Sequence, residues 1–574
     1  MTAEFRAQDA ERLEQILASY DDAGRAGLLP LLLEVQREFQ YISETTADAI
    51  GRRLRIPLAD IHGVIEFYTM LYREPVGETV VRVCTSPMCS MVGSRDALKA
   101  ACGHLDVAEG EPTSDGAFSV ESVECLGLCA MAPAALIGDT PVARIDADDP
   151  AAWVKPPEPA DLGLIGGDQR WLTEHCSIDE SPSLASYQAR GGLRALRRAL
   201  EELQPEGLIK EIKASGLVGR GGAAFPTGMK WEYTAAAVDK PRYVVCNADE
   251  SEPGTFKDRI LLEGDPFAVL EGMLLAAFAV DAAKGYLFVR GEYPRSQSIL
   301  GQAVEQLQAA GILGDHILGS DFCFDLEIRS GAGAYICGEE TALFEAIEGK
   351  RGFPRLKPPF PTTHGLFGKP TVINNVETLC AATWIVANGV DAYRSVGTQD
   401  SPGSKLFCLS GDIARPGVYE VAFGTRLGEL IEMAGGIVGE PVAVLLGGAA
   451  GAFATPDQFD LPMTFEDLNK VGLSLGSGVV TVINDERDLK QFMVDLAEFF
   501  AHESCGKCFP CQLGTQRQLE IVERFANGEA HKGDLDALHD VGFAMTNASI
   551  CGLGMTASTA ILSSVAKWPE LWTY

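Results

Sequence analysis

Eight of the 15 cysteines fall into two compact sets, and these sets constrain the fold more than any other feature of the sequence. The first set consists of Cys84 and Cys89 in CTSPMC and of Cys125 and Cys129 in CLGLC. Each pair follows a β-branched, strand-like run, which predicts two thiolate loops side by side at one end of a small α/β unit. Four thiolates in two loops suit a [2Fe–2S] cluster or a structural zinc ion, and unligated cysteines are the plainer alternative.

The second set begins in ESCGKCFPC, where Cys505, Cys508 and Cys511 are each separated by two residues, and ends with Cys551 in SICGLG. A three-residue period in a tight loop can present three thiolates to one centre. Three regular cysteines with a remote fourth are typical of an iron–sulfur site rather than a zinc finger, so the spacing predicts a [4Fe–4S] cluster. We expect the nearby His502 not to be a ligand.

Charge and hydropathy exclude two classes of partner. The chain carries 47 basic and 80 acidic residues, a net charge of −33, which would repel nucleic acid and an anionic membrane surface. Its start, MTAEFRAQDAERLEQ, lacks the apolar run of a signal peptide, and its longest apolar stretch, residues 272–280, is too short to cross a bilayer. These features predict a cytoplasmic protein without membrane insertion. Scattered cysteines such as Cys323 and Cys380 are then expected to be small core hydrophobes.

The 574 residues exceed what one core usually supports, and changes of periodicity divide them into a multidomain α/β protein. A large central region alternates strands with helical stretches and glycine-rich turns, as in an open, Rossmann-like α/β sheet. The predicted units are a helical bundle at 1–76, an α/β unit at 77–153, a Pro-, Gly- and acid-rich linker at 154–184, the central α/β domain at 185–402, a β-rich unit at 403–487 and a helical unit at 488–574.

A glycine-rich loop, GLVGRGGAAFPTGMKW at 216–231, opens the central region. Its glycines would let backbone N–H groups approach a phosphate, with Arg220 or Lys230 as countercharge. By itself the stretch could equally be a surface loop, because it differs from a dinucleotide-binding fingerprint.

Two acidic segments favour a nucleotide site. CNADESEPGTFKDR at 246–259 places Asp249, Glu250 and Glu252 directly after a strand, and residues 330–361 contain the pair Glu339–Glu340. Carboxylates accept hydrogen bonds from ribose hydroxyls and flavin nitrogens, although an acidic pair at a helix start could simply balance the helix dipole.

These motifs together resemble a known family. The glycine and acidic segments, GAYICGEETALFEAIEGKRG, ESCGKCFPC and SICGLG are similar to the flavin-bearing, NADH-oxidising subunit of respiratory complex I. Residues 1–150 resemble its thioredoxin-like [2Fe–2S] partner subunit. The two look fused into one chain, as in the diaphorase subunits of soluble NAD-dependent formate dehydrogenases and NAD-reducing hydrogenases.

The resemblance implies noncovalent FMN, NAD(H), a [2Fe–2S] and a [4Fe–4S] cluster, a β-grasp domain at about 403–485 and a four-helix domain around the second cluster. The positions implied to line the flavin are Gly219, Arg220, Gly221, Gly222, Lys230, Asn247, Asp249, Tyr335, Gly338, Glu339, Asn374 and Asn375. Phe225, Tyr233 and Phe360 match the aromatics that would sandwich the adenine, and Glu252 and Glu340 would contact NAD.

One position departs from the family pattern. Ala224 stands where the family's loop usually has glycine, so we expect either a negative φ at this residue or a slightly shifted loop.

The function implied is a diaphorase that exchanges hydride between NAD(H) and FMN and relays single electrons through its clusters. No side chain need act as acid or base, and Glu339 would tune the flavin. We expect the partner to be the molybdenum- or tungsten-pterin subunit of a formate dehydrogenase, with a nickel–iron hydrogenase as the alternative. Rivals from other classes are a zinc-stabilised scaffold without redox activity and an NADH-dependent quinone or dye reductase that acts alone.

Overall fold

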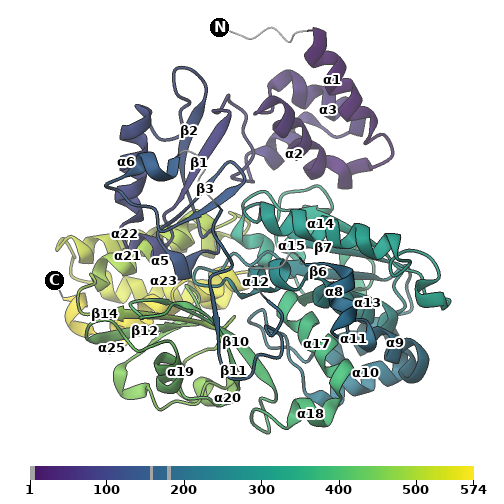
Figure 1. Ribbon diagram of the computed structural model, residues 1–574. Coiled ribbons are helices and arrows are strands. Elements are labelled where there is room, and N and C mark those ends of the chain that lie inside the picture. Colours follow the sequence, from purple (N-terminus) through teal and green to yellow (C-terminus); the bar gives the residue numbers. More distant parts are fainter. Residues whose placement is uncertain (1–6, 155–158, 177–181, 574) are drawn as a thin grey trace.

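The computed structural model describes residues 7–154, 159–176 and 182–573, so the first six residues of the predicted bundle and parts of the predicted linker lie outside it. The N-terminal lobe contains α1 (Ala7–Ala18), α2 (Leu28–Phe39), α3 (Glu44–Leu54) and α4 (Leu58–Ile65). Apolar residues at helical spacing, such as Leu28, Leu32 and Val35, are fully buried between these helices. In Figure 1 they form a separate lobe at the N-terminal end.

A four-stranded sheet follows, with the order β2-β1-β3-β4. Its strands are β1 (Thr79–Cys84), β2 (Phe118–Val123), β3 (Ala134–Ile137) and β4 (Thr140–Ala143), with α5 (Pro87–Ser90), α6 (Ser94–Leu105) and α7 (Pro150–Val154) around them. Strands β1 and β2 are parallel, and Cys84 pairs with Val123. The two predicted cysteine loops therefore leave the sheet at neighbouring strand ends.

The central domain is built on a parallel sheet in the order β8-β7-β6-β9. Its strands are β6 (Tyr243–Ala248), β7 (Lys284–Val289), β8 (Asp325–Ser330) and β9 (Thr371–Asn375). Its helices include α8 (Leu184–Ala189), α9 (Arg194–Arg198), α10 (Gln204–Ser215), α11 (Thr227–Ala236), α12 (Lys257–Gly264), α13 (Pro266–Val280), α14 (Pro294–Ala309), α15 (Glu340–Ile347), α16 (Pro361–His364), α17 (Val376–Asn388) and α18 (Val390–Arg394). The chain runs outward from β6 to β8 and then returns to the other side of β6 as β9, which creates a switch point between β6 and β9.

The next sheet has the order β13-β12-β14-β10-β11-β5. Its strands are β10 (Ser404–Gly411), β11 (Gly417–Ala422), β12 (Pro441–Leu446), β13 (Ala452–Ala454) and β14 (Val479–Asn484), with α19 (Leu427–Met433) and α20 (Phe465–Lys470). Strand β5 (Leu164–Gly166) comes from the segment predicted as a linker and pairs in parallel with β11.

The buried carboxylate of Glu420 anchors the same segment, because it accepts hydrogen bonds from the backbone N–H groups of Leu172 and Thr173 at 2.9 and 3.0 Å. In the part of 154–184 that the structure describes, the chain therefore completes a sheet as well as connecting two domains. Its composition gave no signal for this role, since strand β5 has only three residues.

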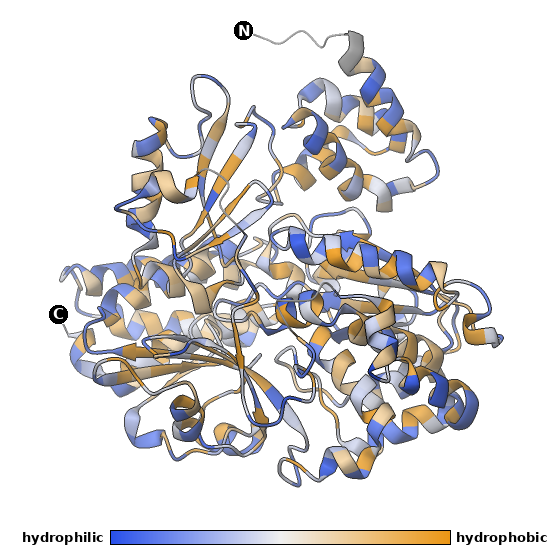
Figure 2. Ribbon diagram, in the orientation of Figure 1, coloured by the Kyte–Doolittle hydropathy of each residue, from blue (hydrophilic) through white to orange (hydrophobic). Residues whose placement is uncertain are grey.

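The C-terminal unit is helical and consists of α21 (Leu489–Glu503), α22 (Phe509–Ala526), α23 (Asp534–Ala548), α24 (Gly552–Thr556) and α25 (Thr559–Lys567). Helix α22 packs against both α21 and α23. Apolar residues concentrate along the central strands and alternate with polar ones on the outer helices (Figure 2). Among the described residues, no helix is both long and apolar enough to cross a membrane.

Candidate functional site

A cavity of about 460 Å³ lies at the switch point of the parallel sheet. Asn247, near the end of β6, pairs in register with Asn375, the last residue of β9, and both side chains line the cavity. Ligands of open α/β sheets bind at this position, outside the carboxyl ends of the strands. The volume falls in the range of nucleotide and cofactor pockets, so the space suits the predicted flavin.

Residues predicted from the sequence form much of the cavity wall. Gly221 and Gly222 come from the glycine loop, and Gly222 has a φ of +121° that side-chain-bearing residues rarely adopt. A Cβ atom on Gly221 would lie 3.2 Å from Cβ of Asn375, so the loop approaches the end of β9 closely. The predicted residues that line the cavity are Gly221, Gly222, Asn247, Asp249, Glu250, Glu252, Tyr335, Gly338, Glu339 and Asn375.

The carboxylates of the first acidic segment are buried. Burial raises the pKa of Asp249 and of Glu252 to about 7 and that of Glu250 to about 8. Glu252 accepts hydrogen bonds from the hydroxyl of Tyr335 and from the backbone N–H of Ala450 at 3.0 Å. This side of the cavity is therefore lined by acidic groups that are close to half-protonated at neutral pH when the cavity holds only solvent.

Glu250 also has a structural role. Its carboxylate accepts backbone hydrogen bonds from Asp258 at 2.6 Å and from Arg259 at 2.8 Å, at the start of α12. It thereby satisfies N–H groups of the first helical turn.

The Glu339–Glu340 pair lies at the start of α15. Glu339 caps this helix, accepting from the N–H groups of Thr341 and Ala342, as the alternative of dipole compensation anticipated. Lys357 Nζ donates to both glutamates, at 2.8 and 2.7 Å. Glu339 also lines the cavity, so its capping and site roles coexist.

Eight of the predicted cofactor residues do not line this cavity. Arg220 is turned away from it: the guanidinium donates to the hydroxyl of Tyr393 at 2.6 Å and lies 4.5 Å from the ring centroid of Phe423. Asn374 accepts a hydrogen bond from the indole of the fully buried Trp231. The remaining six are Gly219, Phe225, Lys230, Tyr233, Glu340 and Phe360.

The three aromatics of this group are exposed, as a stacking surface requires. Phe225, Tyr233 and Phe360 have exposed fractions of 44%, 46% and 57%. Tyr233 lies on α11 and Phe360 directly precedes α16, and these two helices pack against each other. Lys230, on the same helix as Tyr233, lies 3.6 Å from Glu340.

Ala224 has a φ of +51°, so the expectation of a negative φ is wrong. The loop keeps the left-handed conformation in which glycine is favoured, and the alanine bears a steric cost of about 1–2 kcal/mol.

Sequence reasoning missed a buried charge network beneath the cavity. Lys257 lines the cavity, and its ammonium contacts Asp258 at 2.7 Å and Glu377 at 3.0 Å. Glu377 also accepts from Lys405 at 2.8 Å, and these side chains are at most 3% exposed. Burial opposes ionisation of Glu377, but Lys405 and Lys257 lower its pKa to about 2. Lys257 and Asp258 belong to the quoted segment 246–259, whereas nothing local in the sequence marked Glu377 and Lys405.

Two other domains complete the wall. The β-rich unit contributes Gly447, Ala450, Ser474 and Ser477 among others, and the helical unit contributes Gly552, Leu553 and Thr556. These positions lie far from the predicted motifs in sequence and reach the cavity only through the packing of domains.

The first cysteine set converges as predicted. Cys84, Cys89, Cys125 and Cys129 are all at most 5% exposed, and the Sγ atoms of Cys125 and Cys129 lie 3.3 Å apart. The neighbouring thiols and burial raise the pKa of Cys89, as expected where thiolates are brought together without a bound cation. Four adjoining thiols at one sheet end fit a cluster held by four thiolates.

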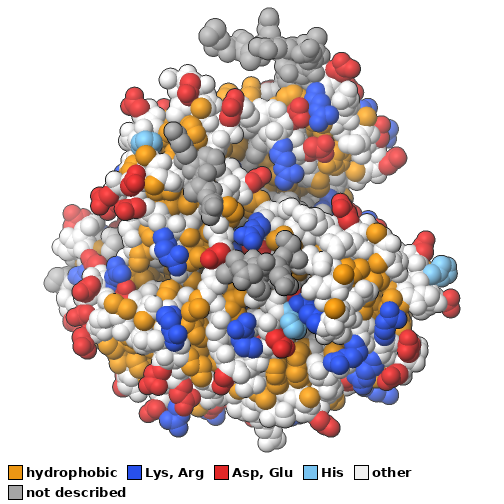
Figure 3. All heavy atoms as spheres, in the orientation of Figure 1, with side chains coloured by type: hydrophobic (Ala, Val, Ile, Leu, Met, Phe, Trp, Pro, Cys, Tyr) orange, Lys and Arg blue, Asp and Glu red, His pale blue; other side chains and the backbone are white. Residues whose placement is uncertain are grey.

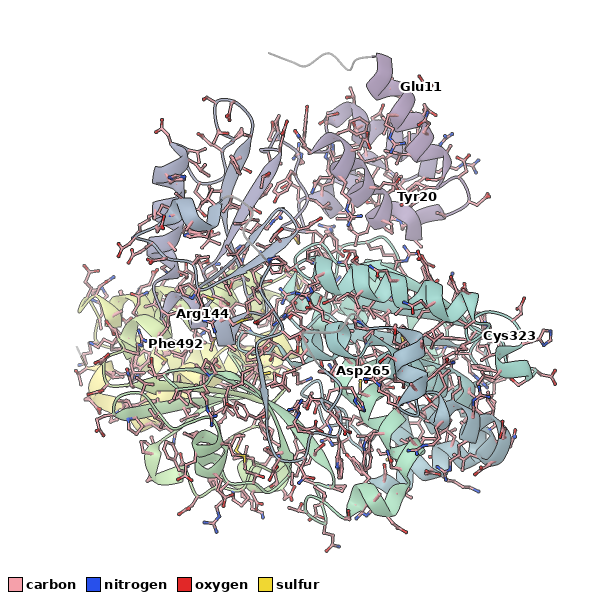
Figure 4. The ribbon with its side chains drawn as sticks, viewed as in Figure 1. Glu11, Tyr20, Arg144, Asp265, Cys323 and Phe492 are labelled. Carbon is pink, nitrogen blue, oxygen red and sulfur yellow. The ribbon has the colours of Figure 1, made fainter. Side chains whose placement is uncertain are left out.

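The second cysteine set lines one small cavity, with Cys505, Cys508, Cys511 and Cys551 in its wall. His502 is not part of this wall, as expected. Of the scattered cysteines, Cys380 is buried in the core, whereas Cys323 is only partly buried and lies at the periphery (Figure 4). The prediction of a core position is therefore wrong for Cys323.

Comparisons with known proteins agree with this arrangement. The sequence matches four families: the thioredoxin-like [2Fe–2S] ferredoxin over residues 13–155, the Nuo51 FMN-binding domain over 212–384, the SLBB domain over 406–448 and the NADH-ubiquinone oxidoreductase-F iron–sulfur binding region over 491–573. A helix–sheet–helix chain with these sites is thus a flavin- and iron–sulfur-containing NADH dehydrogenase of the complex I type.

Among similar proteins, the alpha subunit of the NAD-reducing hydrogenase HoxS of Cupriavidus necator is 36% identical over 98% of this chain and 94% of its own length. The NADH-quinone oxidoreductase of Aquifex aeolicus provides another relative, its F subunit, which is 45% identical over 68% of this chain and 90% of its own. A crystal structure of an air-oxidised NAD⁺-reducing [NiFe]-hydrogenase superposes with a TM-score of 0.84 at 34% identity, covering 95% of this chain and 92% of that one.

The chain belongs to the family of fused diaphorase subunits, in which a thioredoxin-like [2Fe–2S] domain precedes a complex I-type FMN and [4Fe–4S] subunit. Its cofactors are FMN, [2Fe–2S] and [4Fe–4S], and NADH is its substrate. The zinc scaffold is therefore not supported.

The raised pKa of Asp249 makes stability depend on pH. An aspartate in an unfolded chain titrates near pH 4, whereas here burial moves the pKa to about 7. Below pH 4 both states hold the proton, and between about pH 4 and 7 only the folded state does. The free energy of unfolding therefore falls as pH rises, by up to about 1.4 kcal/mol per pH unit for this group.

We expect Asp249→Asn to remove this contribution in flavin-depleted protein. The difference in unfolding free energy between wild type and variant should shift in favour of the variant from pH 5 to pH 7, measured by denaturant titration at each pH. The exposed Asp148→Asn should show no such trend. A pH-independent difference for Asp249→Asn would contradict the assigned pKa.

Proposed function

We propose that this chain is the diaphorase subunit of an NAD-dependent formate dehydrogenase, passing electrons between NAD(H) and a molybdenum- or tungsten-pterin subunit in the cytoplasm. The observation that carries the relay is a shared wall. Ile336 and Leu553 line both the flavin cavity and the cavity of the [4Fe–4S] cysteines. A carrier in the first cavity would thus be separated from the cluster by single side chains.

When bound, FMN supplies the exchange between hydride transfer and single-electron transfer that NADH and the clusters need. The chain would hold it by the backbone of Gly221 and Gly222 and by the side chains of Asn247 and Asn375. Lys257 offers the cavity a positive charge that Glu377 and Asp258 keep ionised, because burial acts against its charge and their charges raise its pKa. We assign Glu339 a positioning role, since Lys357 and the capped helix hold its carboxylate in place.

NADH would enter along the exposed aromatics Phe225, Tyr233 and Phe360, which offer stacking faces for an adenine. The acidic residues Glu252 and Glu340 lie further in and would favour NAD over NADP, because they would repel a 2′-phosphate. We also propose the domain limits 1–76, 77–153, 185–402, 403–487 and 488–574, with a β-grasp unit fourth and a four-helix unit last.

The partner's docking surface is assigned to the end of the relay. Large apolar side chains surround the [4Fe–4S] loop: Phe509 and Leu513 on α22, Phe543 on α23 and Met555 on α24, with exposed fractions of 73%, 50%, 71% and 39%. Cys508 and Cys551 directly precede α22 and α24. Clustered apolar exposure of this kind marks interaction sites. The face in Figure 3 instead mixes acidic and basic side chains over most of its area.

We expect Phe543→Ser to weaken association with the partner subunit by about 10–100-fold, since exposed aromatics in such patches dominate binding. NADH-dependent dye reduction by the chain should be unchanged. The measurement is the dissociation constant from a pull-down or interferometry titration. The control is Val238→Ser, which changes a 99% exposed valine in the loop after α11. Equal affinity for the two variants would refute this surface.

A second candidate is the diaphorase subunit of an NAD-reducing nickel–iron hydrogenase, favoured by the whole-length similarity to the HoxS alpha subunit. Anaerobic addition of formate, hydrogen or NADH to the native complex separates the two, with flavin bleaching and cluster EPR as readouts. Reduction by formate and by NADH supports the first proposal. Reduction by hydrogen and NADH, without formate, replaces it by the second.

A further inference from the structure

A single buried arginine joins the [2Fe–2S] loop to the flavin loop. Arg290 directly follows β7 and is 2% exposed. Its Nη2 donates to the carbonyl oxygen of Cys125 at 2.6 Å, and its Nη1 donates to the carbonyl oxygen of Glu250 at 2.8 Å. One guanidinium thus bridges a cluster ligand and a residue that lines the flavin cavity, although the two are 125 positions apart in the chain.

The other edge of the guanidinium is held by a carboxylate. Glu292 accepts from Nε at 3.2 Å and from Nη2 at 2.8 Å, and its side chain is 12% exposed. The ring of Tyr293 lies 5.1 Å from the guanidinium carbon. The planar fork of an arginine is therefore fully used, and a lysine could not reproduce the two bridging bonds.

The surrounding residues are shaped for the same contact. A Cβ atom on Gly127 would lie 2.0 Å from the hydroxyl of Tyr293, so only glycine lets the CLGLC loop approach this closely. That hydroxyl donates to Glu250 at 3.1 Å, and Arg259 donates to the carbonyl of Gly127 at 3.2 Å. The FMN domain thus completes the environment of the [2Fe–2S] loop.

We propose that Arg290 is a positioning residue that clamps the [2Fe–2S] loop to the flavin loop and raises the reduction potential of the cluster. A cluster held by four thiolates gains one negative charge when it accepts one electron. A fixed cation in a water-poor site stabilises that added charge, and Glu292 partly offsets it from the far edge of the guanidinium. The potential thus depends on both members of the Arg290–Glu292 pair, with opposite signs.

The test is an EPR-monitored redox titration of the full chain with both clusters assembled. Arg290→Gln leaves the carboxylate unbalanced, so the [2Fe–2S] midpoint should fall. We expect at least a tenfold lower ratio of reduced to oxidised cluster at a given potential, which is 59 mV for one electron. Glu292→Gln leaves the cation unbalanced, so the midpoint should rise. Loss of packing alone would move both variants in the same direction.

Arg290→Lys keeps the charge but breaks the bridge. We expect its potential to stay nearer to wild type than that of Arg290→Gln, while amide hydrogen exchange of residues 125–129 becomes severalfold faster. The [4Fe–4S] midpoint is the internal reference, and Arg524→Gln, which breaks a pair in the C-terminal helices, is the matched control.

Midpoints that shift together, or that do not shift in Arg290→Gln and Glu292→Gln, would overturn the proposal. If Arg290→Gln does not assemble the cluster, Glu292→Gln still decides, because a midpoint that does not rise contradicts the charge assignment. The wild-type titration tests the redox function separately, since NADH must reduce the clusters whatever sets their potentials.

Discussion

Replacing Cys551 by alanine is expected to abolish the [4Fe–4S] cluster while leaving flavin in place. The residue lies in the wall of the small cavity with the other three cysteines and is 9% exposed. Three remaining thiolates leave one iron without a protein ligand. We expect four fewer iron atoms per chain, an unchanged FMN content and electron transfer from NADH to the partner that is slower by a factor on the order of 100 or more.

The control for this variant is Cys323→Ala, which changes a partly buried cysteine at the periphery. It should retain full iron content and full transfer to the partner. NADH-dependent reduction of a dye that takes electrons at the flavin should survive in both variants. Full transfer to the partner in Cys551→Ala would mean that electrons leave by another route.

Replacing Glu377 by glutamine is expected to produce the largest loss of stability. Its carboxylate is fully buried between the ammonium groups of Lys257 and Lys405 and also accepts from the N–H of Leu406 at 3.1 Å. Removal of the negative charge leaves two buried cations facing each other. Breaking a buried pair in this way costs about 3–5 kcal/mol.

The measurement is guanidinium denaturation of the FMN-loaded protein, with the first unfolding transition as the readout because the chain has several domains. FMN retention should fall as well, since Lys257 lines the cavity. Asp460→Asn, which breaks an ion pair with a 92% exposed aspartate, should change stability by less than about 1 kcal/mol. A loss below 1 kcal/mol for Glu377→Gln would contradict the charge network.

The parts that sequence predicted well were those set by local patterns. Cysteine spacing identified both cluster sites, because ligands that share one metal centre must come from tight loops or neighbouring strand ends. The segments containing Gly221, Asp249 and Glu339 each leave a strand or begin a helix, so chain direction alone placed them at the carboxyl edge of the sheet.

The remaining features depend on packing between distant segments. Arg220 and Asn374 belong to the correct motifs, but their side chains satisfy Tyr393 and Trp231 rather than line the cavity. Lys405 and the bridge from Arg290 to Cys125 involve residues whose partners are about 28 to 165 positions away. Strand β5 was missed because three residues carry no measurable periodicity.

The relay itself is tested most directly by adding NADH anaerobically to the purified full chain and recording flavin absorbance and low-temperature EPR on the same sample. The structure predicts loss of flavin absorbance together with two cluster signals of different relaxation, of which Cys551→Ala keeps only the [2Fe–2S] signal. Bleached flavin without any cluster signal, in protein with its full iron content, would contradict electron transfer from the flavin to the clusters.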